Sequence, residues 1–189
     1  MKKYLFLFLF SFSVVGYGQF NTESIYFSGM TNFSTGFEIM SDDFGSSGFI
    51  PLNMKIEGGY FIKNRLAVGG NFTIDDIRIP LWGENQNYYY SVHLGPTIRY
   101  YIPRADEYHI YLYGYGFYGF EPNHNLYGLQ FGPGINYFFN ESISLDARFS
   151  YTFKHTFNRA MGGSHNNHRF LFELGISVFF PSLKFFERG

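Results

Sequence analysis

The stretch "SISLDARFSYTF", residues 142–153, decides the fold class. Apolar and aromatic side chains from Ile143 to Phe153 occupy one parity, and Ser, Thr, Asp146 and Arg148 occupy the other. Successive side chains of a β-strand point to opposite faces, so this pattern predicts a strand with one apolar face and one polar face. Asp146 and Arg148, which carry opposite charges, then share the polar face.

Seven further segments show the same alternation over about ten residues, the strand length that crosses an outer membrane at a tilt. No helical periodicity interrupts them. The eight predicted strands cover residues 23–35, 51–62, 65–77, 88–102, 108–120, 126–139, 142–153 and 168–180.

The connections between these segments also follow a pattern. Gaps this short cannot hold crossover helices, so neighbouring strands are expected to pair antiparallel. Short turns at one end and longer loops at the other are typical of a bacterial outer-membrane barrel, and an even strand count places both ends of the barrel on the periplasmic side. The longer connections are 36–50, 80–87, 121–125 and 155–167, and the short ones are 63–64, 103–107 and 140–141.

Composition narrows the class of protein. The chain of 189 residues is long enough for one domain. It has no cysteine, which excludes disulfides and thiolate metal sites. Its formal net charge is −1 and it carries no basic stripe, so we expect no nucleic-acid partner. The 17 tyrosines and 26 phenylalanines exceed the needs of a soluble core and suit a membrane–water interface.

The N-terminal segment has the features of a targeting sequence. In "MKKYLFLFLFSFSVVGYGQ" two lysines precede an apolar run from Tyr4 to Val15, and small residues follow. This predicts a secretory signal peptide over residues 1–18. A retained anchor helix is the alternative, which the shortness of the run disfavours. The predicted organisation is a signal peptide (1–18), a transmembrane barrel (19–180) and a short periplasmic tail (181–189).

A soluble eight-stranded barrel would show the same alternation, with its apolar parity inside. Three features favour a membrane barrel, whose apolar parity faces out. The polar parity carries complementary charges that could pair in a narrow lumen. Few lysines decorate the strands. Aromatic residues also crowd the strand ends, which predicts two interfacial girdles. The predicted girdle residues are Tyr88–Tyr90, Tyr100, Tyr101, Tyr137–Phe139, Phe179 and Phe180.

Charged residues of the polar parity are then expected to converge inside the barrel. The interior of an eight-stranded barrel is just wide enough to be filled by side chains. A charge left unpaired there costs several kcal/mol. The sequence therefore predicts an ion-paired plug in place of an open pore. Its predicted members are Lys55, Glu57, Asp75, Arg99, Asp146, Arg148, Arg169 and Glu173.

Glycines crowd the segments 108–120 and 126–139, and no Lys-Ser or Lys-Thr pair follows them to make a phosphate loop. Glycine in a strand marks a bend or a close approach. We expect these residues to make room for neighbouring tyrosine rings. They are Gly114, Gly116, Gly119, Gly128, Gly132 and Gly134.

Three stretches carry a family resemblance: "GGYFIKNRLAVGGNF" (58–72), "LGPTIRYYIP" (94–103) and "GPGINYFFNESISLDARFSYTF" (132–153). They resemble the small outer-membrane β-barrel family of Gram-negative bacteria, the "porin family" or outer membrane protein beta-barrel domain. That family is similar to the barrel domain of outer-membrane protein A. The resemblance implies an all-β, eight-stranded, up-and-down antiparallel barrel in the outer membrane.

The end of the chain adds to this resemblance. "ELGISVFF" (173–180) is similar to the terminal-strand signal that the barrel assembly machinery reads. The family usually stops at the aromatic residue, whereas "PSLKFFERG" follows here. That tail is too short for a peptidoglycan-binding domain. The residues in the signal positions are Glu173, Gly175, Val178 and Phe180.

Histidines raise the possibility of a metal site, because His155, His165 and His168 fall in or beside one predicted loop. Such a site needs three or four convergent ligands. The loop is rich in Gly and Asn and has no nearby carboxylate, so the expected reading is a polar extracellular loop with no metal and no cofactor.

A barrel enzyme that modifies lipid A is a second alternative. It would need a Ser or Asp activated by a His near the outer leaflet. Asp75, Asp76 and Ser91 lie near predicted extracellular strand ends, where His124 or His155 could approach them. Their spacing singles out none of them, so we expect no enzyme and no catalytic residue.

The function expected from the sequence is non-enzymatic: envelope structure, or an accessory subunit of an outer-membrane complex. A narrow, non-specific channel is the alternative. The expected partners are outer-membrane lipid including lipopolysaccharide, the barrel assembly machinery during biogenesis, and a larger outer-membrane complex. The predicted loop 36–50, with Met40, Phe44 and Phe49 around an acidic pair, is a candidate contact surface.

Overall fold

A computed structural model describes residues 20, 22–33, 49–80, 90–103, 108–121, 124–158 and 163–180. The predicted signal peptide, the predicted tail 181–189 and residues 36–48 of the first predicted loop lie outside these residues. Among the described residues no helix is long and apolar enough to cross a bilayer.

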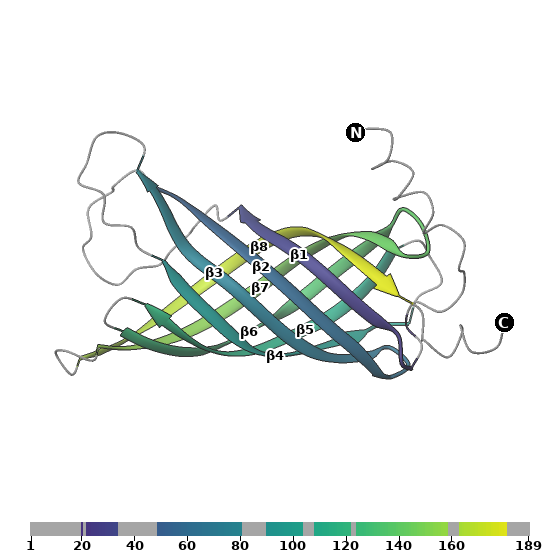
Figure 1. The fold of residues 1–189 in the computed structure, drawn as a ribbon, viewed down its shortest axis with the longest axis horizontal. Helices are drawn as coiled ribbons and strands as arrows, with labels where there is room; N and C mark the ends of the chain where they lie inside the picture. The colour runs from purple at the N-terminus through teal and green to yellow at the C-terminus, as the bar shows by residue number, and fades with distance from the viewer. Residues whose placement is uncertain are drawn as a thin grey trace.

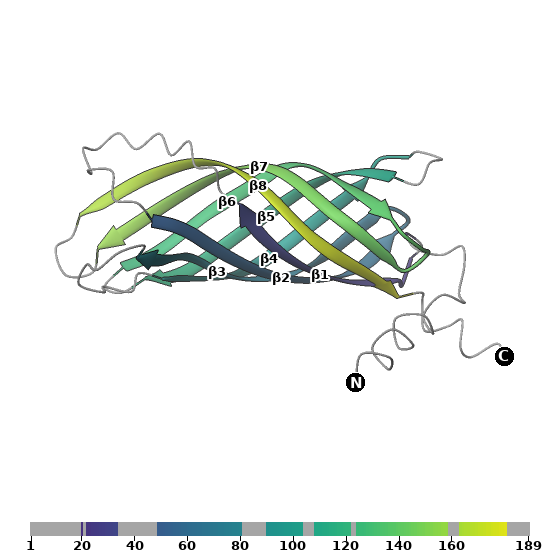
Figure 2. The same cartoon turned by 90° about the horizontal axis from the view of Figure 1, so that it is seen from above.

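The predicted fold is confirmed: eight antiparallel strands form one closed barrel in chain order. The strands cross the barrel at a common tilt, and β1 begins at the same end at which β8 finishes (Figures 1 and 2). Pairing of β1 with β8, from Ile25 opposite Phe180 onward, closes the sheet. The strands are β1 (Ile25–Phe33), β2 (Phe49–Lys63), β3 (Leu66–Pro80), β4 (Ser91–Tyr101), β5 (Tyr108–Glu121), β6 (His124–Phe138), β7 (Ile143–Asn158) and β8 (Ser164–Phe180).

The two parities of each strand have opposite surroundings. In β7, Phe149 is 52% exposed on the outer wall, whereas Asp146 and Arg148 are fully buried inside the barrel. The other strands repeat this arrangement, so Ile56, Leu94 and many other large apolar residues are exposed on the wall. An apolar surface this extensive is suited to contact with lipid.

Two predicted connections are shorter than expected. The predicted range of the loop 155–167 was wrong because it was too long: β7 continues to Asn158, and β8 already begins at Ser164. The predicted loop 121–125 is also reduced, since β5 ends at Glu121 and β6 begins at His124. Polar residues occupy both faces at these strand tips, so the alternation that marks a strand in lipid fades there although the backbone pairing continues.

The predicted girdles are correct only in part. Tyr100, Tyr137 and Phe139 are exposed on the outer wall, as expected for interfacial rings. Tyr101 and Phe179 instead lie inside the barrel and are almost fully buried, and Phe138 packs against this core as well. The inward parity carries these rings at the periplasmic end, where the centroids of Tyr101 and Phe179 are 6.4 Å apart. The predicted girdle residues Tyr88 and Tyr89 lie outside the described residues.

Candidate functional site

Six fully or almost fully buried charges lie inside the middle of the barrel, three positive and three negative. They come from β2, β4, β7 and β8, and each sits on the inward parity of its strand. We call them the central ionic cluster: Lys55, Glu57, Arg99, Asp146, Arg148 and Glu173.

The members of this cluster form a chain of alternating sign. Arg99 donates from Nε to Glu57 Oε1 (2.6 Å) and from Nη1 to Asp146 Oδ2 (3.0 Å). Arg148 Nη2 donates to Glu57 Oε2 (3.3 Å), and its Nη1 lies 3.7 Å from Glu173 Oε2. Lys55 Nζ completes the chain with an ion pair to Glu173. Each inner member of the chain therefore has an opposite charge on both sides.

Tyrosine and amide side chains add further partners to the carboxylates and to Arg148, whereas Arg99 Nη2 and Arg148 Nη1 make no hydrogen bond within the described part of the chain. The Tyr26 hydroxyl donates to Glu57 (2.6 Å), and Gln130 Nε2 donates to Glu173 (3.0 Å). The Arg148 guanidinium lies 3.5 Å from the centroid of the Tyr113 ring, a cation–π contact that is strengthened by the exclusion of water. Buried charges are tolerated only with such additional partners.

A row of aromatic rings lines β5 on its inner face, and the facing positions of β6 are mostly glycine. An added Cβ at Gly134 would lie 2.2 Å from Cζ of Tyr111, which explains why this position carries no side chain. The prediction that glycines make room for tyrosine rings is thus confirmed at Gly134. At Gly114 and Gly116 an added Cβ would instead meet Ile98 and Leu129. The row of rings consists of Tyr111, Tyr113, Tyr115 and Phe117, all buried.

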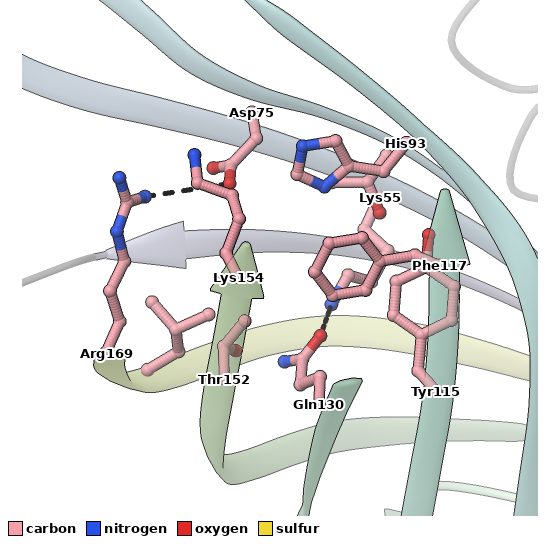
Figure 3. A pocket seen from close by; sticks show the side chains of 11 residues that line it. Lys55, Asp75, His93, Tyr115, Phe117, Gln130, Thr152, Lys154 and Arg169 are labelled. Atoms are coloured by element: carbon pink, nitrogen blue, oxygen red, sulfur yellow. Dashed lines mark hydrogen bonds and ion pairs between the residues drawn. The ribbon is translucent and has the colours of Figure 1, made fainter. Parts of the chain in front are cut away.

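A small cavity of about 20 Å³ lies beside the cluster in the outer half of the barrel, with room for about one water molecule (Figure 3). Arg169 Nη1 lies 3.7 Å from Asp75 Oδ2 at its wall. Lys154, which also lines the cavity, donates to Glu121 (3.0 Å). The His93 ring stacks on Phe117 with centroids 4.9 Å apart. The outer half therefore also pairs its charges.

The periplasmic end is filled by an aromatic seal around Phe20. The Phe20 ring lies 4.2 Å from Tyr101 and 4.7 Å from His109, measured between centroids. Its carbonyl accepts a hydrogen bond from Arg65 N–H (2.9 Å) in the turn between β2 and β3. The remaining rings of the seal, at 5.7 to 5.8 Å from Phe20, are Phe61, Phe138 and Phe179.

The eight residues predicted for the lumen fall into two groups. Six form the central ionic cluster, and Asp75 with Arg169 forms the pair beside the cavity. Sequence reasoning missed Lys154, Glu121 and the tyrosines that touch the arginines. Lys154 continues the inward parity of 142–153 by two residues, which was the available signal. No comparable signal marks Phe20.

The four residues of the predicted assembly signal occupy both faces of β8. Glu173 belongs to the central ionic cluster, and an added Cβ at Gly175 would lie 2.2 Å from the Gly29 carbonyl oxygen. Phe180 packs edge-to-face on Phe27 of β1 (6.1 Å), and Val178 pairs with Phe27 in the β1–β8 ladder. All four lie at the seam that closes the barrel.

The candidate metal and catalytic residues do not converge among the described residues. His155 Nδ1 bonds to Asn166 Oδ1 (2.7 Å), and His168 Nδ1 bonds to the Tyr151 hydroxyl. The Ser91 hydroxyl donates to the Asp75 carbonyl oxygen (3.5 Å). Within the described part of the chain no group of three His, Asp or Glu could hold a metal ion. The side chains of His165 and Asp76 lie outside the described residues.

A closed antiparallel barrel with an apolar outer wall and charges paired inside it defines a class: the chain has the fold of the small eight-stranded outer-membrane β-barrels. No protein-family model matches the sequence, and no curated protein matches it.

Solved structures of this class are similar to the chain in fold. Neisserial surface protein A is 15% identical, with a TM-score of 0.54 over 82% of this chain and 94% of that one. The N-terminal β-barrel domain of Pseudomonas aeruginosa OprF is 10% identical, with a TM-score of 0.51 over 84% and 98%. A de novo designed transmembrane β-barrel is 8% identical, with a TM-score of 0.50 over 87% and 100%.

Proposed function

We propose that this protein is a non-enzymatic outer-membrane barrel whose lumen is closed, and that it acts through its outer surface in envelope structure or as an accessory subunit of a larger complex. The observation that carries the proposal is the alternating chain of six buried charges from Asp146 to Lys55. It joins strands on different sides of the barrel and has no net charge.

An ion that crossed this lumen would have to separate members of the chain. Each separated charge would remain in a site where water is largely excluded, at a cost of several kcal/mol. The aromatic seal adds a second obstruction at the periplasmic end. The same geometry therefore argues for structure and against transport.

Fold similarity alone does not favour any one activity. A designed barrel shares the fold, so the fold can exist without an evolved function, and function must be argued from the residues that this chain carries. In this chain the buried charges of the central ionic cluster pair with one another, which leaves the outer wall and the extracellular rim as surfaces for contact.

Conductance across a planar lipid bilayer tests the closed lumen. The wild-type protein should give no steady channels, and Arg148→Ser should give some, because it removes a ring-stacked arginine from the chain of charges. Steady wild-type channels whose conductance changes in Arg148→Ser would instead establish the narrow channel. Val68→Ala, on the outer parity, is the matched control and should leave the bilayer silent.

The two non-conducting roles differ in the size of the native particle. Gentle detergent extraction of the tagged protein, followed by size analysis and identification of co-purifying chains, separates them. Migration as a single barrel in its micelle supports a role in envelope structure. Reproducible migration within one large assembly supports an accessory subunit. Altered lipid A in a strain that overproduces the protein would contradict the non-enzymatic proposal.

A further inference from the structure

The outward face of the barrel contains one feature that the closed lumen does not explain. Between the periplasmic turns and the extracellular rim, the described outward side chains include no Lys, Arg, Asp or Glu. The groups there that can take up a positive charge are two imidazoles, His155 on β7 and His168 on β8. Both lie on the extracellular half of the longest hairpin.

Each imidazole is held in place by a neighbouring strand. His155 Nδ1 donates to Asn166 Oδ1 (2.7 Å), since an amide oxygen can only accept. His168 Nδ1 is bonded to the Tyr151 hydroxyl across the same hairpin. Ring contacts add to this: Tyr127 lies 4.9 Å from His155 and Phe153 lies 5.3 Å from His168. With Nδ1 engaged in both rings, Nε2 is the atom of each that can meet a ligand.

The spacing of the two imidazoles suits one tetrahedral anion. In the β7–β8 ladder His155 pairs with Asn166, and Phe153 pairs with His168. The two histidines are therefore diagonal neighbours, about 7–8 Å apart. Two N–H···O hydrogen bonds of about 2.9 Å to different oxygens of one phosphate would span this separation.

The side chains around the two histidines indicate which kind of ligand would bind there. Toward the membrane centre the same wall carries Leu129, Phe149 and Phe170, all exposed and apolar. Toward the rim the hairpin ends in Asn158 and Ser164. Tyr127, 53% exposed, has an amphipathic ring of the type that lies at a lipid–water boundary. The two imidazoles thus lie where acyl chains give way to polar head groups.

We propose that His155 and His168, supported by Tyr127 and Tyr151, form an outward-facing site for a phosphate group of an outer-leaflet glycolipid. The acyl chains of that lipid lie along the apolar wall of β6–β8, and its phosphate accepts hydrogen bonds from the imidazole Nε2–H groups. Because His155 Nδ1 already donates to Asn166, His155 binds the phosphate in its imidazolium form, in which both ring nitrogens donate. The inference rests on the outer-membrane placement of the proposed function and is independent of whether the lumen is closed.

Native mass spectrometry of the full-length protein in detergent, titrated with diphosphorylated lipid A, tests this site. The double variant His155→Gln/His168→Gln should bind lipid A at least about tenfold more weakly, since two charge-assisted hydrogen bonds are lost. Chemically dephosphorylated lipid A should bind the wild-type protein and the double variant equally. Circular dichroism and heat-dependent gel mobility establish that each variant is folded.

Tyr118→Gln is the matched control, because Tyr118 lies in register with Tyr127 and His155 but is carried by β5. It should bind lipid A like the wild type. The proposal is overturned if the double variant binds lipid A with wild-type affinity, or if Tyr118→Gln loses as much affinity for lipid A as the double variant does. It is also overturned if the only effect of the double variant is the loss of a dimer of this chain. None of these results depends on conductance, so the two proposals can fail separately.

Discussion

Glu57 is the residue on which the buried charges depend most. Its carboxylate accepts hydrogen bonds from Arg99, Arg148 and Tyr26 and is fully buried on β2. Neither arginine can lose its charge, so removal of the Glu57 charge leaves both guanidinium groups short of a partner. This carboxylate is the only one described that bridges the two arginines by hydrogen bonds.

Glu57→Gln should therefore lower the free energy of unfolding by about 3–5 kcal/mol, the usual cost of breaking a buried pair. Urea unfolding from phosphatidylcholine vesicles measures the change. Glu121→Gln, near the rim, should cost only about 1 kcal/mol, because the glutamine oxygen can still accept the hydrogen bond of Lys154. Equal losses of unfolding free energy in the two variants would contradict the larger dependence of the central ionic cluster on Glu57.

Gly134 shows the opposite requirement, for the absence of a side chain. Gly134→Ala would place a methyl group 2.2 Å from the Tyr111 ring, which is fully buried and bonded to Asp146. We expect a loss of about 1–3 kcal/mol in unfolding free energy, as for overpacked cores. Gly29→Ala is the control, since nothing lies within 4 Å of an added Cβ there. A wild-type stability of Gly134→Ala would contradict the close packing.

At the scale of the strand, β7 faces two different environments: the packed polar interior on one side and the apolar outer wall on the other. Its even-numbered residues face the buried charges, and its odd-numbered residues face outward. Phe149→Arg would place a charge near the middle of the outward face and should cost about 2–4 kcal/mol of folding stability in lipid vesicles. Phe157→Arg, near the rim and also exposed, should cost about 1 kcal/mol or less. A loss that does not depend on depth would contradict the lipid-facing wall.

The strands and their parity could be predicted because one face must suit lipid and the other a narrow interior, so the alternation is strict. The tips of β7 and β8 could not, because beyond the apolar layer a polar residue suits either face. The inward direction of Tyr101 and Phe179 follows from the same parity as Arg99 and Glu173, so the prediction of a girdle there overlooked an available signal. The packing of Phe20 between these rings could not be predicted, because Phe20 precedes the first strand and has no parity.

The pairing of the predicted charges also lay beyond the sequence. Parity predicts that Lys55 and Glu173 point inward, and it does not say that they meet. Which strands place their charges at one height depends on the tilt and stagger of the whole barrel. The closed register between β7 and β8 sets Arg148 opposite Glu173, and the crossing of the lumen brings in β2 and β4.

For the whole molecule, two separate layers of buried side chains fill the barrel interior: the central ionic cluster and the aromatic seal. Phe20→Ala should lower the unfolding free energy by about 2 kcal/mol, less than for a fully buried phenylalanine because Phe20 is partly exposed. The variant should remain silent in planar bilayers, since the central ionic cluster is untouched. Combining it with Arg148→Ser should give a larger conductance than Arg148→Ser alone. Channels in Phe20→Ala by itself would show that the seal is the only barrier.

The Phe20 ring also has a consequence for the order of folding. Seven of the eight strand pairings join neighbours along the chain, and only β1 with β8 joins its two ends. Contacts between distant parts of a chain form slowly, because a long loop must first be closed. The Phe20–Phe179 contact spans the same separation and forms when the seam does. The ring-current shifts of the Phe20 and Phe179 side chains would therefore report when β1 pairs with β8, the last step of barrel assembly.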